Sequence, residues 1–206
     1  ANTEAAIKEA MTGKAPKLVV GEAALKAQPK LRGALAGVLK KKPHLRTDGI
    51  VLRREGNRVY LAGNNDRAHY FAIAELLRRW GCRWYIPTEF GECIPEERNL
   101  SVGALDHAYS SPFEVRTYWI SWVGDNTGRR EFQMRNMMTE RGDMPQSGHA
   151  LGKYTKGLGK GKGTFNFPIT DPKTAEHVAT KVESMYAEGK MFSLGMEDGS
   201  YDSAYP

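Results

Sequence analysis

Two adjacent carboxylates, Glu197 and Asp198, are candidates for acid–base chemistry because of where they stand in the sequence. They lie at the end of the run from Met191 to Glu197, which predicts a β-strand. Glycoside hydrolysis generally uses two carboxyl groups, one that donates a proton to the leaving oxygen and one that acts as base or nucleophile. Neighbouring residues of a strand face opposite sides, so both carboxylates reach one cleft only where the strand ends between them. An exposed acidic loop tip is the alternative interpretation.

Four residues of another strand, predicted over residues 113–122, could bind a sugar: Arg116, Tyr118, Trp119 and Trp122. The arginine and the tyrosine share one face of that strand, and the two tryptophans stand near its end. Aromatic rings stack on sugar faces, and an arginine fork holds a hydroxyl or a carboxylate. Core packing is the alternative for one of the tryptophans. His149, near the end of a brief strand predicted over residues 147–151, could bond a sugar hydroxyl, and a structural role is its alternative.

The sequence after Pro112 alternates strand-like and helix-like segments. Strands are expected over residues 113–122, 147–151 and 191–197, and helices over residues 129–141 and 171–189. Val178, Val182 and Met185 form the apolar stripe of the second helix. This alternation is typical of βα units around a parallel sheet, and it predicts roughly three such units.

The stretch from Asn64 to Pro87 combines a helix start, an amphipathic helix, a helix stop and a short strand. Side-chain oxygens of residues 64–66 can cap the first helical turn, and Gly81 can close the helix in a left-handed conformation. Between them, apolar residues recur at helical spacing: Tyr70, Ile73, Leu77 and Trp80. Trp84-Tyr-Ile then predicts a strand that ends at Pro87.

Two β-rich runs precede that helix, over residues 49–53 and 58–62, and a turn at Gly56 joins them into a predicted hairpin. A first strand is expected over residues 17–21, and helices are expected over residues 3–11 and 29–42. Strand, helix, hairpin, helix and strand together predict a small α/β layer.

Three segments of this layer carry a family resemblance: Asp48-Gly-Ile-Val-Leu, Leu61-Ala-Gly-Asn-Asn-Asp-Arg and Gly81-Cys-Arg-Trp-Tyr-Ile-Pro. With this order of elements, they resemble the N-terminal accessory domain of α-glucuronidases and β-N-acetylhexosaminidases. The chain is most similar to a large family of secreted bacterial glycoside-hydrolase-like proteins, described as a domain of unknown function. The likeness runs from about Lys17 to the C-terminus, and it is specific up to Trp122.

The resemblance implies an α/β fold in two domains, a small accessory domain over residues 1–111 and the first βα units of a (β/α)8 TIM barrel over residues 112–206. It implies a glycoside hydrolase that acts on polysaccharides or glycans, needs no cofactor and is secreted or periplasmic. A whole barrel takes about 250 residues, so the barrel is expected to be incomplete here. A longer chain, a partner chain that supplies the missing strands, or an open sheet instead of a barrel are the alternatives. A non-catalytic carbohydrate-binding or assembly module on the same fold is the alternative function.

The resemblance and the strand pattern disagree about the catalytic pair. The family motif at this place is an Asp-Gly pair, which Asp198-Gly199 matches. Strand alternation instead puts Glu197 on the small-residue face with Ser193 and Gly195, which suits a barrel interior. Hexosaminidases carry Asp then Glu on a later strand, and this departure leaves the role of the pair open.

The composition is that of an ordinary soluble globular protein, with 40% hydrophobic and 26% charged residues in a chain of 206. No apolar run approaches the roughly 20 residues that a membrane span requires, so no span is expected. The first five residues show no charged and apolar leader. A cytosolic protein and a secreted protein after signal removal both fit that observation.

The net charge of +6 makes nucleic acid a partner to consider. The lysines gather at residues 40–42 and 153–162, without the interleaved aromatic residues of a stacking platform and without a recognition-helix pattern. Nucleic acid binding is therefore not expected, whereas an anionic polysaccharide would suit the same lysines. The glycine- and lysine-rich run over residues 156–164 does not match the phosphate-binding loop pattern, and it predicts a basic surface loop.

Cys82 and Cys93 bracket a turn that contains proline and glycine. A local disulfide and two free thiols are both compatible with this spacing. The sequence contains no Cys-x-x-Cys pair and no histidine cluster, so no metal site is expected.

Overall fold

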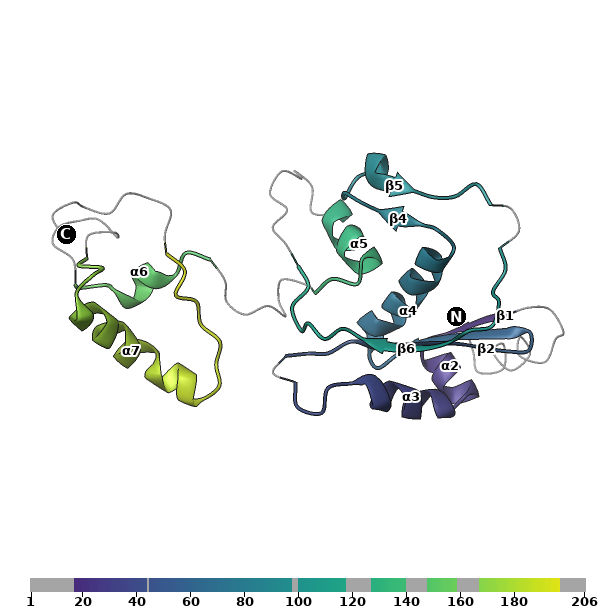
Figure 1. The fold of residues 1–206 in the computed structure, drawn as a ribbon, viewed down its shortest axis with the longest axis horizontal. Helices are drawn as coiled ribbons and strands as arrows, with labels where there is room; N and C mark the ends of the chain where they lie inside the picture. Colours follow the sequence, from purple (N-terminus) through teal and green to yellow (C-terminus); the bar gives the residue numbers. More distant parts are fainter. Residues whose placement is uncertain are drawn as a thin grey trace. The chain divides into compact units, whose positions relative to one another are not determined.

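The computed structural model describes residues 17–43, 45–97, 100–117, 127–139, 148–158 and 167–196. The chain divides into two compact units, Ala1–Asp143 and Met144–Pro206, hereafter unit 1 and unit 2 (Figure 1). This division falls later in the sequence than the predicted boundary before Pro112. The helix expected over residues 3–11 lies outside the described residues.

Unit 1 is built on a four-stranded mixed sheet with the order β1-β3-β2-β6. Its strands are β1 (Lys17–Val20), β2 (Gly49–Glu55), β3 (Arg58–Gly63) and β6 (Asp106–Ser110). β1 is parallel to β3, whereas β2 is antiparallel to both of its neighbours. The predicted hairpin is confirmed, because β2 and β3 pair around Gly56, which has a φ of 59°. The sequence patterns did not predict β6.

Helices cover both faces of this sheet, α2 (Glu22–Ala27) and α3 (Lys30–Val38) on one face and α4 (Asp66–Arg79) on the other (Figure 1). The sequences of the central strands are therefore apolar without a break, because alternate residues of each strand face different cores. One core joins Val51, Tyr60 and Ala62 to residues of α2 and α3. The other core joins Ile50, Leu52 and Leu61 to residues of α4.

α4 is capped as the sequence predicted, because the Asn65 side chain accepts a hydrogen bond from the Ala68 N–H at 3.0 Å and Gly81 has a φ of 93°. The face of α4 that packs on the sheet overlaps the predicted stripe in part, because Ile73 and Trp80 are partly buried against the core between α4 and the sheet. Phe71, Ala72 and Leu76 are buried against the sheet, whereas Tyr70 is 38% exposed. α4 is apolar over a wide arc because a second layer covers it on the side away from the sheet.

That second layer consists of α5 (Thr127–Arg135), a 3₁₀ turn (Glu89–Gly91) and the paired strands β4 (Arg83–Trp84) and β5 (Glu92–Cys93). Phe132 of α5 packs with Cys82 and Trp84, and Leu77 of α4 lies against this cluster. The contact between α5 and α4 explains why residues beyond Pro112 belong to unit 1. α5 ends at Arg135, before the predicted end at residue 141, and Met137 has a φ of 53°.

Both cysteines are free thiols. Cys82 is buried in the cluster with Phe132, whereas Cys93 is exposed on β5. The structure therefore selects the free-thiol alternative.

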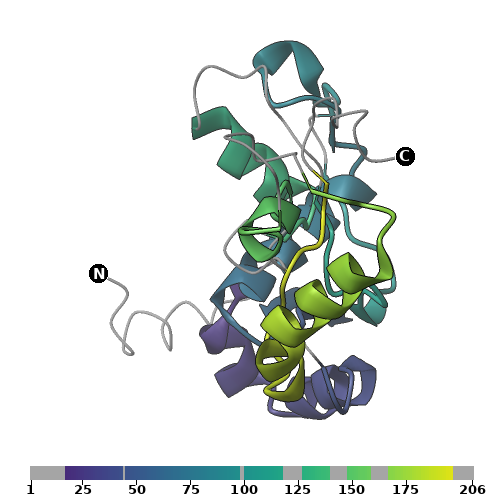
Figure 2. The same cartoon turned by 90° about the vertical axis from the view of Figure 1, so that its left-hand side faces the viewer.

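Unit 2 contains the short helix α6 (Leu151–Tyr154) and the long helix α7 (Pro172–Ala187), which is the yellow-green helix in the foreground of Figure 2. The Asp171 side chain caps α7 by accepting a hydrogen bond from the Lys173 N–H at 2.9 Å. Val178 and Val182 are buried along α7, as predicted. Met185, the third residue of the predicted stripe, is half-buried.

The strands predicted after Pro112 are largely not formed in the described residues. Residues 113–117 of the first contain no strand. In the second and third, His149 and Gly195 form one isolated parallel bridge, and the chain enters α6 directly after residue 150. The described part of the protein is a mixed α/β fold, and it shows no repeated βα units of a TIM barrel. The isolated bridge pairs one residue of each segment, whereas the alternating pattern predicted whole strands.

Within the described ranges, no helix combines the length and the apolar character that crossing a membrane requires.

Candidate functional site

The structure describes two of the seven predicted site residues, Arg116 in unit 1 and His149 in unit 2. The other five lie outside the described residues: Tyr118, Trp119, Trp122, Glu197 and Asp198.

In unit 1, polar residues converge at one edge of the sheet. β1, β3 and β6 run in the same direction, so their carboxyl ends share this edge with the start of β2. Hydrogen bonds join the loops at this edge. Asn64 Oδ1 accepts a hydrogen bond from the Gly49 N–H at 2.7 Å, and Ser110 Oγ donates one to the Asp48 carbonyl at 3.2 Å. Ligands of open α/β sheets bind at such an edge, outside the carboxyl ends of the strands.

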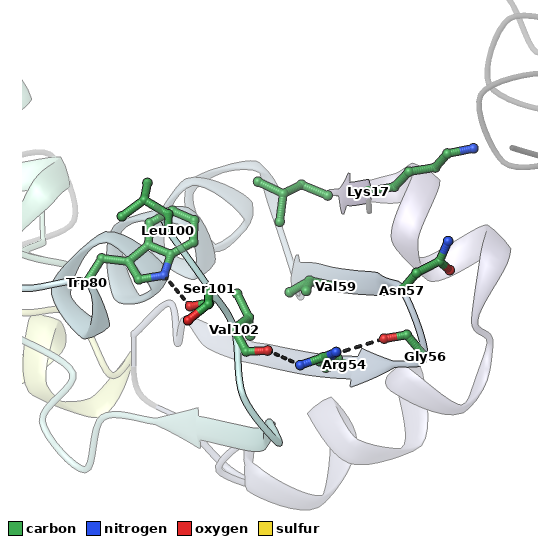
Figure 3. A pocket seen from close by; sticks show the side chains of 10 residues that line it. Lys17, Arg54, Gly56, Asn57, Val59, Trp80, Leu100, Ser101 and Val102 are labelled. Carbon is green, nitrogen blue, oxygen red and sulfur yellow. Dashed lines mark hydrogen bonds between the residues drawn. The ribbon is translucent and has the colours of Figure 1, made fainter. Parts of the chain in front are cut away.

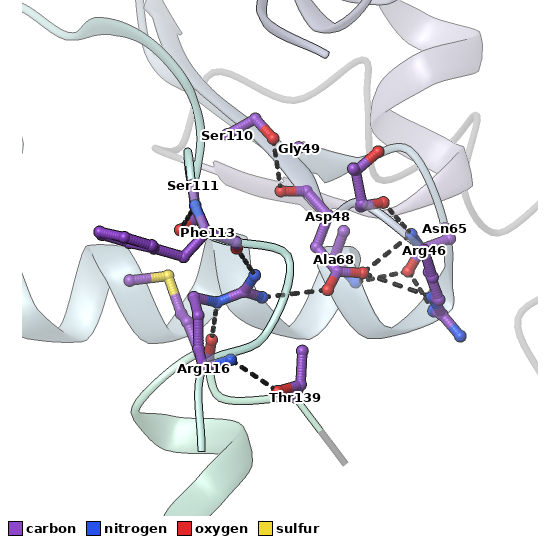
Figure 4. A network of polar contacts seen from close by, with 12 residues as sticks. Arg46, Asp48, Gly49, Asn65, Ala68, Ser110, Ser111, Phe113, Arg116 and Thr139 are labelled. Atoms are coloured by element: carbon purple, nitrogen blue, oxygen red, sulfur yellow. Dashed lines mark hydrogen bonds and ion pairs between the residues drawn. The ribbon is translucent and has the colours of Figure 1, made fainter. Parts of the chain in front are cut away.

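The centre of this edge is the carboxylate of Asp48, whose side chain is 2% exposed (Figure 4). Its Oδ2 lies 3.1 Å from Nη2 of Arg116, and its Oδ1 lies 3.4 Å from Nε of Arg46. Asn65 Nδ2 donates to the same Oδ1 at 3.0 Å. Two cations and an amide thus compensate one buried charge, as a buried carboxylate requires.

Arg116 directs its guanidinium to protein acceptors (Figure 4). Nε donates to the Met137 carbonyl at 2.8 Å, and Nη1 donates to the Phe113 carbonyl at 2.9 Å. Its backbone N–H donates to Thr139 Oγ1 at 2.8 Å, and its carbonyl accepts from the Thr139 N–H at 2.9 Å. Arg116 therefore fastens the segment after β6 and the segment after α5 to the sheet edge, which is a structural role. Its predicted sugar contact stays a prediction.

Sequence reasoning missed Asp48 and Thr139 as partners of Arg116. Asp48 carried one usable signal, because it stands directly before the apolar run of β2 and so enters the protein interior with it. No such sequence signal exists for Thr139, because its hydrogen bonds with Arg116 form only once α5 has packed on α4.

His69, near the start of α4, supports the same edge. Its Nδ1 accepts a hydrogen bond from the Gly63 N–H at 2.9 Å, so this nitrogen carries no proton. The ring also packs beside Gly21, which has a φ of 65°. The histidine thus joins the ends of β1 and β3 to α4.

In unit 2, His149 lies against the segment that leads to the predicted catalytic pair. Its Nδ1 donates to the Met196 carbonyl at 2.6 Å, and Glu197 is the next residue in the sequence. The Ala150 N–H donates to the Gly195 carbonyl at 3.0 Å, and Ser193 Oγ donates to the Gly148 carbonyl at 2.9 Å. The two segments are thus joined by side-chain and backbone bonds on both sides of the bridge.

Replacing Gly195 with alanine is expected to break this junction. A Cβ at this position would lie 2.3 Å from the Gly148 carbonyl oxygen, a backbone atom that cannot move away alone. Overpacking of this kind costs about 1–3 kcal/mol. We expect the His149 ring resonances in an NMR spectrum to shift toward those of an unstructured histidine. The control variant is Ala179→Ser, on the exposed face of α7, which should leave these resonances unchanged. Unchanged resonances in Gly195→Ala would contradict the geometry of the bridge.

A separate pocket of about 490 Å³ in unit 1 lies beside Trp84. Glu89, Glu92 and Glu131 are among its lining residues. The guanidinium carbon of Arg135 lies 5.4 Å from the centre of the Trp84 ring, and Arg135 also pairs with Glu92. Carboxylates that line a hollow can accept hydrogen bonds from the hydroxyls of a sugar.

Among the residues that the structure places, no group of three or more histidine, cysteine, aspartate or glutamate side chains is arranged to hold a metal ion.

The fold and these contacts define a mixed α/β protein with a polar cluster at the carboxyl edge of its sheet. Comparison with protein-family models, with curated proteins and with solved structures found no match to this chain.

Proposed function

We propose that this chain belongs to a glycoside hydrolase that acts on polysaccharides or glycans, with Glu197 and Asp198 as its acid–base residues. The observation that supports the proposal best is the parallel bridge between His149 and Gly195. α7 lies between these residues in the sequence, so two parallel segments are joined through a helix, as in a βα unit. On this proposal further βα units, supplied by a longer chain or by a partner chain, complete the catalytic barrel.

His149 supports the placement of the substrate in this proposal. In a parallel barrel, chemistry is carried at the carboxyl ends of the strands, and on this proposal His149 and the segment before Glu197, which are joined by one bridge, would stand at such an end. His149 would then position a sugar hydroxyl while the carboxylates act on the glycosidic bond. Tyr118, Trp119 and Trp122 remain proposed stacking residues for the sugar.

In this proposal, unit 1 is the accessory domain of the hydrolase. The polar cluster at its sheet edge is occupied by contacts within the protein, since Arg116 and Asn65 both bind Asp48. Such a cluster stabilises a scaffold and leaves the acid–base chemistry to other residues.

The test is hydrolysis of a panel of 4-nitrophenyl glycosides by the protein together with the further chain that completes its barrel, and by three variants of this protein. Glu197→Gln and Asp198→Asn each remove one ionisable group with little change of shape, and loss of a general acid or base lowers the rate about a hundredfold or more. Glu183→Gln, on the exposed side of α7, is the matched control and should keep full activity. Activity that survives loss of both carboxylates would exclude their assignment.

The second candidate is a non-catalytic carbohydrate-binding module, which the pocket beside Trp84 favours. Isothermal titration with oligosaccharides distinguishes the two functions. A binding module would bind sugar with the same affinity in the Glu197→Gln and Asp198→Asn variants, and it would lose affinity in Glu131→Gln. A protein without hydrolytic activity that behaves in this way would favour the second candidate over the first.

A further inference from the structure

The edge strand β1 has a buried face and an exposed apolar face. Leu18 and Val20 lie on the face of the sheet that α4 covers, because they pair with Val59 and Leu61, which are buried in the core with α4. Leu18 is nevertheless 53% exposed and Val20 is 36% exposed. On the other face of β1, Val19 is buried in the core with α2 and α3. The α4 layer therefore extends over β3 but leaves the apolar side chains of β1 in contact with water.

A hollow of about 580 Å³ continues this exposed face at the start of β1. Leu18 and Val59 line it from the sheet, and Trp80 and Leu100 line it from the segments outside the sheet. Figure 3 shows Trp80 and Leu100 together on one side of the hollow, apart from Val59 on the sheet. Trp80 Nε1 donates to the Ser101 carbonyl at 2.9 Å, which fixes the indole ring. The hollow is therefore preformed, and these four residues give it apolar walls.

The exposed face of β1 has room for one short helix beside α4. α4 runs along β1, because its His69 packs against Gly21 at the end of the strand and Trp80 lines the hollow at the start. Neighbouring strands are about 4.8 Å apart and packed helix axes are about 8–10 Å apart, so a helix beside α4 would lie over the edge strand. The four residues of β1 span about 13 Å. A helix of about nine residues has the same length.

The segment that precedes β1 in the sequence has the pattern of such a helix. Residues 3–11 predict a helix of nine residues, and Gly13 is a stop signal after it. At helical spacing, its apolar residues share one side: Ala6, Ile7, Ala10 and Met11. Its charged residues share the other side: Glu4, Lys8 and Glu9. A helix this short is marginal in water by itself, so it needs a surface on which to pack.

The same segment is tied to the exposed face by the chain itself. Five residues, 12–16, connect it to Lys17, which lines the hollow. Connections of about 4–6 residues are the commonest between elements of a compact domain. A short linker holds a segment near its site at roughly millimolar effective concentration, so a few apolar contacts are enough for docking. No other occupant has this advantage.

From this tether and this pattern we infer that residues 3–11 form a helix that packs beside α4 on the exposed face of β1, with Ile7 and Met11 turned toward the strand. The docked helix buries Leu18 and Val20 and fills the apolar hollow. It also covers an edge strand, which otherwise is a surface for unwanted pairing with other chains. The inference concerns the packing of unit 1 and does not depend on the proposed hydrolase activity.

The test is NMR spectroscopy of the whole chain with labelled methyl groups. We expect helical Cα shifts over residues 3–11 and nuclear Overhauser contacts between the methyl groups of Ile7 and Leu18. Ile7→Gln should lower the ratio of docked to free segment about tenfold, because it removes the largest β-branched side chain of the apolar side. Lys8→Gln, on the charged side of the same helix, is the matched control and should keep both the shifts and the contacts.

A second pair of variants tests the surface of the sheet. Leu18→Gln should release residues 3–11 to a similar extent, whereas Ile94→Gln, with a similar exposure of 54% elsewhere in unit 1, should not. A mixture of labelled and unlabelled chains shows whether the contacts form within one chain. Contacts only between chains would identify a second copy as the occupant and would overturn the inference. Random-coil shifts over residues 3–11 in the unaltered protein, or unchanged shifts in Leu18→Gln, would overturn it as well.

Discussion

Replacing Asp48 with alanine will lower the free energy of unfolding of unit 1 by about 3–5 kcal/mol. The carboxylate is 2% exposed, and its removal leaves Arg116, whose side chain is 18% exposed, without its counter-charge inside the protein. Breaking a buried ion pair from one side costs more than the pair contributes, since the remaining charge stays desolvated. Asn65 Nδ2 also loses an acceptor. Urea unfolding followed by tryptophan fluorescence measures the change, because all four tryptophans lie between residues 80 and 122 of unit 1.

Asp106→Ala is the matched control for this experiment. Asp106 pairs with Arg53 at 2.9 Å, but its side chain is 69% exposed. Water and salt screen such a pair, so its loss costs about 0–1 kcal/mol. If the two variants unfold at the same urea concentration, the buried ion pair of Asp48 does not stabilise unit 1 as its burial predicts.

Replacing Gly63 with alanine is expected to destabilise unit 1 by about 3 kcal/mol or more. A Cβ on Gly63 would lie 2.3 Å from the backbone carbonyl carbon of Ala68 and 2.4 Å from its Cβ. Both atoms belong to the first turn of α4, so relief requires the helix to move away from the end of β3. That movement would also break the hydrogen bond from the Gly63 N–H to His69.

Gly33→Ala in α3 is the control for the same chemical change. Apart from the backbone of its own helix and its chain neighbours, no heavy atom lies within 4 Å of a Cβ at Gly33, and the residue is in the interior of a helix. Alanine there should stabilise unit 1 by about 0.5–1 kcal/mol, because glycine costs that much in a helix. The two glycine variants should therefore shift the urea midpoint in opposite directions, and a shift in the same direction would contradict the close approach at Gly63.

The local elements of unit 1 were predictable because their signals are local. The turn at Gly56, the Asn65 cap and the glycine stop at Gly81 each depend on the conformation or the hydrogen bonding of one or two residues. The apolar face of α4 was less predictable. A helix between two layers is apolar over a wide arc, and periodicity does not say which part of the arc meets the sheet.

For the candidate site, the sequence could predict the types of the residues but not their contacts. Arg116 and His149 were identified by their chemistry, yet their partners Asp48 and Met196 lie far away in the sequence. Such contacts depend on which elements pack together, which no local pattern contains. The same reason explains why the barrel units expected after Pro112 were not found in the described residues. α5 packs on α4 instead of covering a parallel sheet.

By itself, the sequence determined the hairpin turn at Gly56 and the start and end of α4, since capping and glycine conformation are properties of neighbouring residues. The tertiary structure alone decided that Arg116 compensates a buried aspartate, that Gly195 must lie against the Gly148 carbonyl, and that the chain divides after α5. Each of these follows from burial and close approach between distant segments, whose free energies exist only in the folded protein.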